Sequence, residues 1–137
     1  MTLIRRREDQ GLASEKSFGD KMQRFPSIKK NAEYQNVYKN GRSQATGLVV
    51  MYVMENGRDH NRLGISVSKR IGNSVVRHTF CRKIREIFRL HDHRTKTGFD
   101  IIIIARNPAK DAPYERLDRD YLKLLERHNI MPKSLEA

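Results

Sequence analysis

A run of basic side chains between Arg62 and Arg89 carries the most evident chemistry of this 137-residue sequence. Eight lysines and arginines stand there against one acidic residue, Glu86. Guanidinium groups bind phosphates through paired, charge-assisted hydrogen bonds. Over the whole chain, 28 Lys and Arg against 16 Asp and Glu give a formal net charge of +12. This charge is typical of proteins that bind polyanions, and we expect such binding to weaken steeply with salt because it releases condensed counterions.

The spacing of these residues predicts a helix over residues 76–90 with two different faces. At about 100° per residue, the apolar side chains fall on one side; they are Val76, Phe80, Ile84, Ile87 and Leu90, with Phe88 at the edge. The opposite side holds Arg77, His78, Arg82, Arg85 and Arg89. We expect the apolar side to pack on a sheet and the basic side to face phosphates. A solvated amphipathic helix is the alternative.

The turn before this helix extends the basic region. Lys69 and Arg70 add two charges, and Gly72-Asn73 forms a turn at the start of the helix. Backbone N–H groups in such a turn can face a phosphate at a helix N-terminus.

Acid–base chemistry has one candidate, the sequence His91-Asp92-His93. Neighbouring side chains point in different directions and no third ligand stands ready for a metal, so we favour a solvated loop over a nuclease site. His60 and His128 are expected at the surface. The single cysteine, Cys81, excludes an internal disulfide and a zinc cluster. These residues therefore favour neither a catalytic nor a metal-ligating site in the protein.

Residues 1–24 mix charges and glycines with few apolar positions, so we expect a flexible N-terminal extension ahead of one domain over residues 25–137. Absence of a long apolar run or a signal peptide predicts a cytoplasmic protein without a membrane segment. Asn31 is the expected N-cap of a short helix that stops at Gly41.

Three strands are predicted, at residues 46–54, 62–68 and 99–105. The second alternates, and Asn-Gly chemistry between the first two favours an antiparallel hairpin. The third is apolar on both sides, as in a central strand. A last helix over residues 114–128 has one apolar stripe, made by Leu117, Tyr121, Leu124 and Leu125. The order helix, strand, strand, helix, strand, helix predicts an α/β (α+β sandwich) fold with one mostly antiparallel sheet.

The stretch RLGISVSKRIGNSVVRHTFCRKIREIFR, residues 62–89, resembles the signature of the bacterial ribonuclease P protein component. That signature reads V-S-K-K-hydrophobic-G-N-A-V, then R-N-R-x-K-R and an R-E pair. IKKNAEYQNVYKNGRS and FDIIIIARNPA are similar to its first helix and its later strand, and the resemblance covers about residues 24–130. Three residues depart from it: His78-Thr79 replaces the usual Asn-Arg, and Cys81 replaces a lysine, so two basic side chains of the motif are missing.

The resemblance implies a ribosomal-protein-like sandwich with a left-handed βαβ crossover, although general topology favours a right-handed one. It also implies a protein that binds, one to one, a catalytic RNA, which with its own Mg²⁺ removes the 5′ leader of precursor tRNA. By motif match, the residues facing the RNA subunit are Lys69, Arg70, Gly72, Asn73, Arg77, His78, Arg82, Arg85 and Arg89. Those expected to contact the leader are Tyr34, Tyr38, Tyr52, Ser66 and Ser68.

Alternatives remain open at this point. Tyr34 and Tyr38, one helical turn apart, can stack on unpaired bases or serve as ordinary core aromatics. A ribosomal or ribosome-assembly protein would have similar charge, size and fold without exposed tyrosines. A helix-turn-helix DNA binder is disfavoured, because a strand precedes the basic helix.

Overall fold

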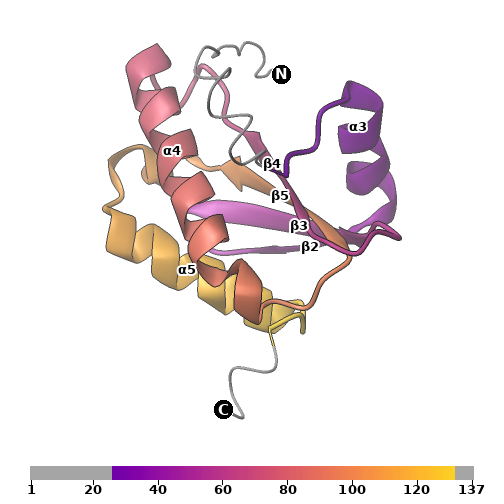
Figure 1. Cartoon of the computed structure of the whole chain (residues 1–137). Helices are drawn as coiled ribbons and strands as arrows, with labels where there is room; N and C mark the ends of the chain where they lie inside the picture. Colours follow the sequence, from indigo (N-terminus) through magenta and orange to yellow (C-terminus); the bar gives the residue numbers. More distant parts are fainter. Residues whose placement is uncertain (1–25, 132–137) are drawn as a thin grey trace, which may run out of the picture.

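Four strands form one sheet in the order β2-β3-β5-β4, with helices on both faces (Figure 1). This computed structural model describes residues 26–131. The strands are β2 Arg42–Ala45, β3 Val49–Glu55, β4 Arg62–Ser66 and β5 Phe99–Ala105. The α-helices are α3 Asn31–Asn40, α4 Ser74–His91 and α5 Tyr114–Arg127, and two 3-10 turns are η1 Asp92–Arg94 and η2 Asn107–Asp111. The predicted extension over residues 1–24 lies outside the described residues, so the domain boundary stays a prediction.

The central position of β5 is confirmed, and it overturns the predicted hairpin. β5 pairs antiparallel with β3 and parallel with β4, so β3 and β4 do not touch as neighbours. Ile101, Ile102 and Ile103 are fully buried, so both faces of β5 are covered, as is common for a central strand. The Asn-Gly sequence does turn the chain, with Gly57 at φ 71°. Its loop passes the start of β5, where Asn56 N–H donates to the Gly98 carbonyl at 2.8 Å.

β2 was not predicted, because all four of its residues are exposed and show no apolar pattern. It pairs antiparallel with β3 as an edge strand, and the turn between them occupies positions assigned to the first predicted strand. The Thr46 hydroxyl accepts N–H bonds from Leu48 at 3.2 Å and Val49 at 3.3 Å. These bonds hold the tight turn and delay the start of β3 to Val49.

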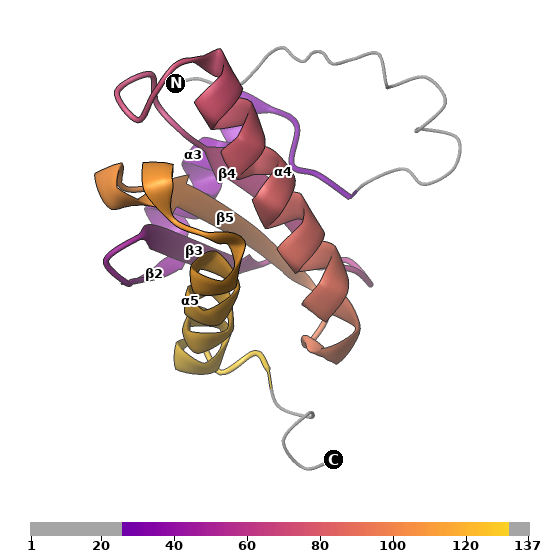
Figure 2. The ribbon, with the colours of Figure 1, turned by 90° about the vertical axis from the view of Figure 1, so that its left-hand side faces the viewer.

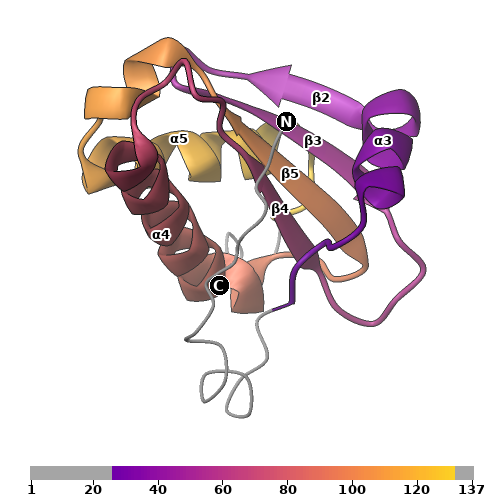
Figure 3. The same cartoon turned by 90° about the horizontal axis from the view of Figure 1, so that it is seen from above.

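The two faces of the sheet pack against different helices (Figure 2, Figure 3). α4 and α5 cover the face that carries Met51, Ile101 and Ile103, and this layer forms the main core. α3 lies on the other face, where Val37 and Ile102 make a smaller cluster. The predicted stripe of the last helix is confirmed, since Leu117, Tyr121, Leu124 and Leu125 are all buried. Layers of helix on sheet therefore give the α+β sandwich expected from the element order.

The buried side of α4 is rotated from the predicted one. Phe80, Ile84 and Ile87 are buried as expected, but Phe88 is fully packed and Leu90 is 52% exposed. α5 packs against α4, and Phe88 belongs to the same buried cluster as Leu117 and Leu124 of α5. At the other end, the Asn73 side chain accepts the Val76 N–H, and the helix begins at Ser74, two residues before the predicted start.

Two histidines expected in solvent are buried by the last helix. His91 ends α4, and its Nε2 lies 2.7 Å from Asp118 Oδ1 on α5. His128 Nε2 lies 3.1 Å from the Met51 carbonyl oxygen. The solvated-loop interpretation is thus wrong for His91, whereas exposed His60 and His93 agree with a surface position. Asp92 instead accepts a hydrogen bond from Asn61 Nδ2 at 2.8 Å.

The start of α3 differs by one residue from the expectation. Lys30 is the N-cap, and its N–H donates to Glu33 Oε1 at 3.2 Å, which takes the capping role assigned to Asn31. Among the helices of the described part, none is long and apolar enough to cross a membrane.

Candidate nucleic-acid interface

The turn before α4 has a conformation set by close packing. Asn73 Oδ1 accepts the Val76 N–H at 3.0 Å and so caps the helix. A Cβ atom at Gly72 would stand 2.8 Å from the Val76 side chain, so only glycine fits there without displacement. Ile71 is buried beside it. The backbone of the predicted phosphate-facing turn is therefore held in one arrangement.

Basic side chains from this turn and from α4 form one surface, which we call the α4 basic surface; its members are Lys69, Arg70, Arg77, His78, Arg82, Arg85 and Arg89. All are exposed except Arg77, which is half-buried because its Nε donates to the Gly72 carbonyl at 3.2 Å. Arg89 meets Glu86 at 3.5 Å in a pair that solvent largely screens. The structure thus brings together the basic residues that the sequence singled out.

Thr79 and Cys81, which stand where the family signature has basic residues, add no charge to this surface. Burial raises the pKa of the Cys81 thiol, while the charges of Arg85 and Arg77 act against that rise. Lys83 does not replace them, since its Nζ reaches away to the Ala112 carbonyl oxygen at 3.2 Å. Arg77, Arg82 and Arg85 therefore supply the arginines of the central motif.

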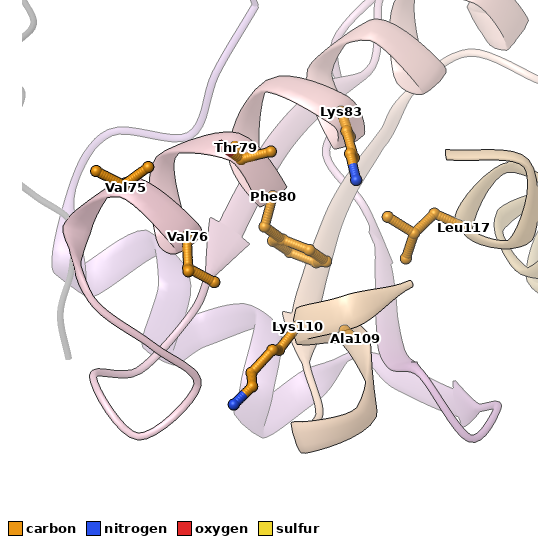
Figure 4. A pocket seen from close by; sticks show the side chains of 8 residues that line it. All are labelled: Val75, Val76, Thr79, Phe80, Lys83, Ala109, Lys110 and Leu117. Atoms are coloured by element: carbon orange, nitrogen blue, oxygen red, sulfur yellow. The ribbon is translucent and has the colours of Figure 1, made fainter. Parts of the chain in front are cut away.

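Lys83 instead borders a shallow hollow between α4, η2 and α5 (Figure 4). The hollow encloses about 150 Å³. Its lining is Val75, Val76, Thr79, Phe80, Lys83, Ala109, Lys110 and Leu117. It shares no member with the α4 basic surface and is mostly apolar.

The predicted tyrosines meet on the sheet face that α3 covers, and we call them the tyrosine cluster. Tyr38 of α3 lies between the others, with ring centroids 6.4 Å from Tyr34 and 5.1 Å from Tyr52 of β3. All three rings are half-buried against the small core of Val37 and Ile102. They therefore belong partly to the core and still present ring surface to solvent.

Tyr34 also covers the outer edge of β4. Its hydroxyl receives the Ile65 N–H, and burial raises the pKa of Tyr34 to about 12. Along the same edge, Ile28 N–H donates to the Leu63 carbonyl at 3.0 Å, and Leu63 N–H donates to the Pro26 carbonyl at 2.9 Å. The charge of Arg85 acts to lower the pKa of Tyr34, against the effect of burial, so the guanidinium group of Arg85 lies near this tyrosine.

The two predicted serines are placed differently. Ser66 ends β4 and its side chain hydrogen-bonds to the Tyr38 hydroxyl, whose pKa is raised mainly by burial. Ser68 lies beyond the strand, exposed, and its Oγ accepts the Arg70 N–H at 3.3 Å. The predicted strand over residues 62–68 was two residues too long, so Ser68 belongs to the turn and does not join the tyrosine cluster.

An ion-pair network that sequence reasoning missed fixes α3 to the sheet. Arg62 Nε and Nη2 donate to the two oxygens of buried Asp100 at 2.9 and 2.8 Å. Glu33 of α3 lies 3.5 Å from Arg62. Burial raises the pKa of Glu33, but hydrogen bonds from the backbone and the Arg62 charge lower it overall. The one signal in the sequence was an aspartate inside an apolar strand.

Within residues 26–131, no group of three or more His, Cys, Asp or Glu side chains is arranged to hold a metal ion. The most buried carboxylate of the region, Asp100, already has Arg62 as its partner. The described side chains therefore do not fit a divalent-cation site of their own.

Comparison with known proteins gives a consistent result. A protein-family model described as Ribonuclease P matches residues 22–129. A curated ribonuclease P protein component from Lachnoclostridium phytofermentans is 46% identical over 108 residues, covering 79% of this chain and 93% of the relative. Another, from a Thermoanaerobacter species, is 50% identical over 98 residues, covering 72% and 84%.

Solved structures show the same similarity in three dimensions. The RNase P protein of Staphylococcus aureus is 42% identical with a TM-score of 0.72, covering 77% of this chain and 96% of that one. The RNase P protein from Thermotoga maritima is 28% identical with a TM-score of 0.69, covering 74% and 96%. The fold described above is therefore one already seen in proteins of that description.

Proposed function

The chain belongs to the bacterial ribonuclease P protein family, and we propose that it binds the RNA subunit through the α4 basic surface and the 5′ leader of precursor tRNA through the tyrosine cluster. Membership makes it the protein component of ribonuclease P, a ribonucleoprotein that processes precursor tRNA. The assignment of the two surfaces to two RNA partners is the proposal.

The observation that carries this proposal is the position of the two surfaces on either side of β4. Tyr34 lies over the strand, and the turn with Lys69 and Arg70 follows directly from its end. Arg85 of α4 interacts electrostatically with Tyr34. A single-stranded RNA segment that lies on the tyrosine cluster would thus run beside guanidinium groups, which neutralise its phosphates. Such contacts do not depend on base sequence.

Stacking explains why tyrosines suit a leader of variable sequence. Each base has a π-face, and a base stacked on an aromatic side chain gains about 1–3 kcal/mol whatever its identity. The half-exposed rings of Tyr38 and Tyr52 offer such faces, while the Ser66 and Tyr38 hydroxyls supply polar groups beside them. The Ser68 contribution is proposed only as part of the turn that faces the RNA subunit.

For the chemical step, we propose that Mg²⁺ is held mainly by the RNA subunit. The described residues do not fit a site for it, so no step of the reaction is assigned to side chains of this chain. We further propose a one-to-one complex with that RNA, acting in the cytoplasm.

The deciding experiment is cleavage of a precursor tRNA at low Mg²⁺ by a bacterial ribonuclease P RNA, with this protein, without it, and with the protein alone. We expect stimulation only when RNA and protein are both present. Arg82→Ala/Arg85→Ala should reduce it, whereas Arg58→Ala/Lys96→Ala, two exposed cations outside both surfaces, should not. Cleavage by the protein alone would show a nuclease instead. Absence of any effect would favour a ribosomal partner.

A further inference from the structure

The last helix, α5, carries equal numbers of acidic and basic residues, but the fold does not distribute them equally. Its cations are Arg116, Arg119, Lys123 and Arg127, and its carboxylates are Glu115, Asp118, Asp120 and Glu126. All four cations are exposed. Of its carboxylates, Asp120 is buried, and Asp118 is half-buried with its Oδ1 2.7 Å from His91 Nε2. A helix that is neutral in sequence therefore presents a basic surface.

The four cations follow one another at intervals of three, four and four residues, which places them along one side of the helix. We call them the α5 basic stripe. With a rise of about 1.5 Å per residue, the stripe extends over roughly 16 Å. The exposed carboxylates Glu115 and Glu126 stand near the two ends of the helix. Among the described residues, Arg116, Arg119 and Lys123 form no ion pair, so their charges are available to a partner.

Arginines from neighbouring elements enlarge this surface around the turn between β2 and β3. Arg127 Nη1 donates to the Ala45 carbonyl oxygen at 2.7 Å, and Arg106 Nη1 donates to the Thr46 carbonyl oxygen at 3.1 Å. Exposed Arg42 lies close enough to His128 for its charge to lower the pKa of that histidine, in addition to the larger effect of burial. Two of these guanidinium groups are thus held in place by backbone carbonyls.

This second surface is separate from the α4 basic surface. β2 and β4 form opposite edges of the sheet, and the turn with Lys69 and Arg70 continues from β4. The α5 basic stripe instead borders β2, as the bond from Arg127 to Ala45 shows. One RNA segment seated on the turn and the tyrosine cluster would leave the opposite edge uncovered.

The chemistry of the second surface fits a nucleic acid that exposes its phosphates while its bases are paired and hidden. In the described part, the large apolar side chains that are exposed are Val75 and Leu90, both on α4, so this surface offers no apolar anchor for a lipid surface. The aromatic residues of α5, Tyr114 and Tyr121, fall on the opposite side of the helix from the stripe, so the stripe also lacks an aromatic platform for unpaired bases. Double-stranded RNA is recognised mostly through shape, phosphates and sugars. We propose that the α5 basic stripe and the adjoining arginines form a second RNA-binding surface, for the backbone of a double-helical RNA segment.

This inference rests on the proposed function only in naming RNA as the polyanion. The test uses the full chain and a blunt 16-base-pair RNA duplex as the probe, with the dissociation constant measured at several salt concentrations. Arg119→Gln/Lys123→Gln replaces two cations of the stripe by glutamine, which keeps a high helix propensity. The matched control, Arg58→Gln/Lys96→Gln, also replaces one arginine and one lysine, but outside the stripe. Thermal unfolding checks that both variants remain folded.

We expect the stripe variant to reduce the slope of log affinity against log salt by about 1.4–1.8, since each lost phosphate contact changes it by about 0.7–0.9. The control should keep the slope of the unchanged protein. Equal slopes for the stripe variant and the control would overturn the inference. Displacement of the duplex by poly-glutamate at equal charge concentration would overturn the assignment to RNA. The proposed function is tested separately, by cleavage stimulation with Arg82 and Arg85 changed. The proposed function and the second RNA-binding surface can therefore fail independently of each other.

Discussion

The hydroxyl of Tyr34 lies directly over the backbone of Gly64, where a Cβ atom would stand only 2.9 Å from the hydroxyl oxygen. The absence of a side chain at this position of β4 lets the ring cross the edge strand and receive the Ile65 N–H. Gly64 thus sets how closely α3 approaches the sheet. A glycine inside a strand commonly marks such a close approach.

Replacing Gly64 by alanine should displace Tyr34 and weaken both the fold and the leader contact. The new methyl group would also meet ring carbons of Tyr34 at 3.0 Å. Overpacking of this kind costs about 1–3 kcal/mol. Urea unfolding measures the loss of stability, and Gly47→Ala is the matched control because nothing lies within 4 Å of its Cβ position. Equal stability of the two variants would contradict the role given to Gly64.

Leader recognition should depend on the ring of Tyr38. Tyr38→Ala removes the central ring of the tyrosine cluster, 5.1 Å from Tyr52. We expect the reconstituted holoenzyme to lose about 1–3 kcal/mol of affinity, roughly 5- to 150-fold, for precursor tRNA. Affinity for mature tRNA without a leader should be unchanged. Tyr38→Phe keeps the ring and loses the hydrogen bond to Ser66, so it separates stacking from the hydroxyl contribution. Equal losses for both tRNAs would speak against a leader site.

Local patterns predicted the helices and the basic surface well. The repeat of apolar positions located α4 and α5 to within two residues, and charge periodicity gathered Arg82 and Arg85 on one side. The resemblance to a known family predicted the specific fold and the function. The predicted role of each site residue stays a prediction, although the structure brings most of them together.

Errors arose where the outcome depends on distant segments. The order of strands follows from insertion of β5 between β3 and β4, which no turn sequence at Asn56-Gly57 reveals. Burial of His91 and His128 depends on α5, which follows the first of them by more than twenty residues. β2 has no apolar alternation at all. The uneven exposure of charges on α5 is invisible in a sequence with equal numbers of both signs.

Stability should fall in mild acid because of His128. Burial lowers the pKa of this histidine, so the folded protein holds it neutral while the unfolded chain takes up a proton near pH 6.5. The contribution of neutral His128 to stability is therefore fully present above about pH 6.5 and is lost as the pH falls through the lowered pKa of the folded state. Over this range the free energy of unfolding falls by at most about 1.4 kcal/mol per pH unit. Urea unfolding between pH 7.5 and 5 measures this slope. His128→Gln should flatten it, and exposed His60→Gln should not.

Anions should stabilise the free protein through the α4 basic surface. Mutual repulsion among cations at a net charge of +12 is relieved when sulfate or phosphate binds the folded state. Binding at ten times the dissociation constant adds about 1.4 kcal/mol to the free energy of unfolding. The thermal midpoint should thus rise with sulfate, and the rise should shrink in Arg82→Gln/Arg85→Gln more than in Arg58→Gln/Lys96→Gln. A midpoint that sulfate leaves unchanged would contradict this expectation, while equal shrinkage in both variants would show general screening rather than binding at α4.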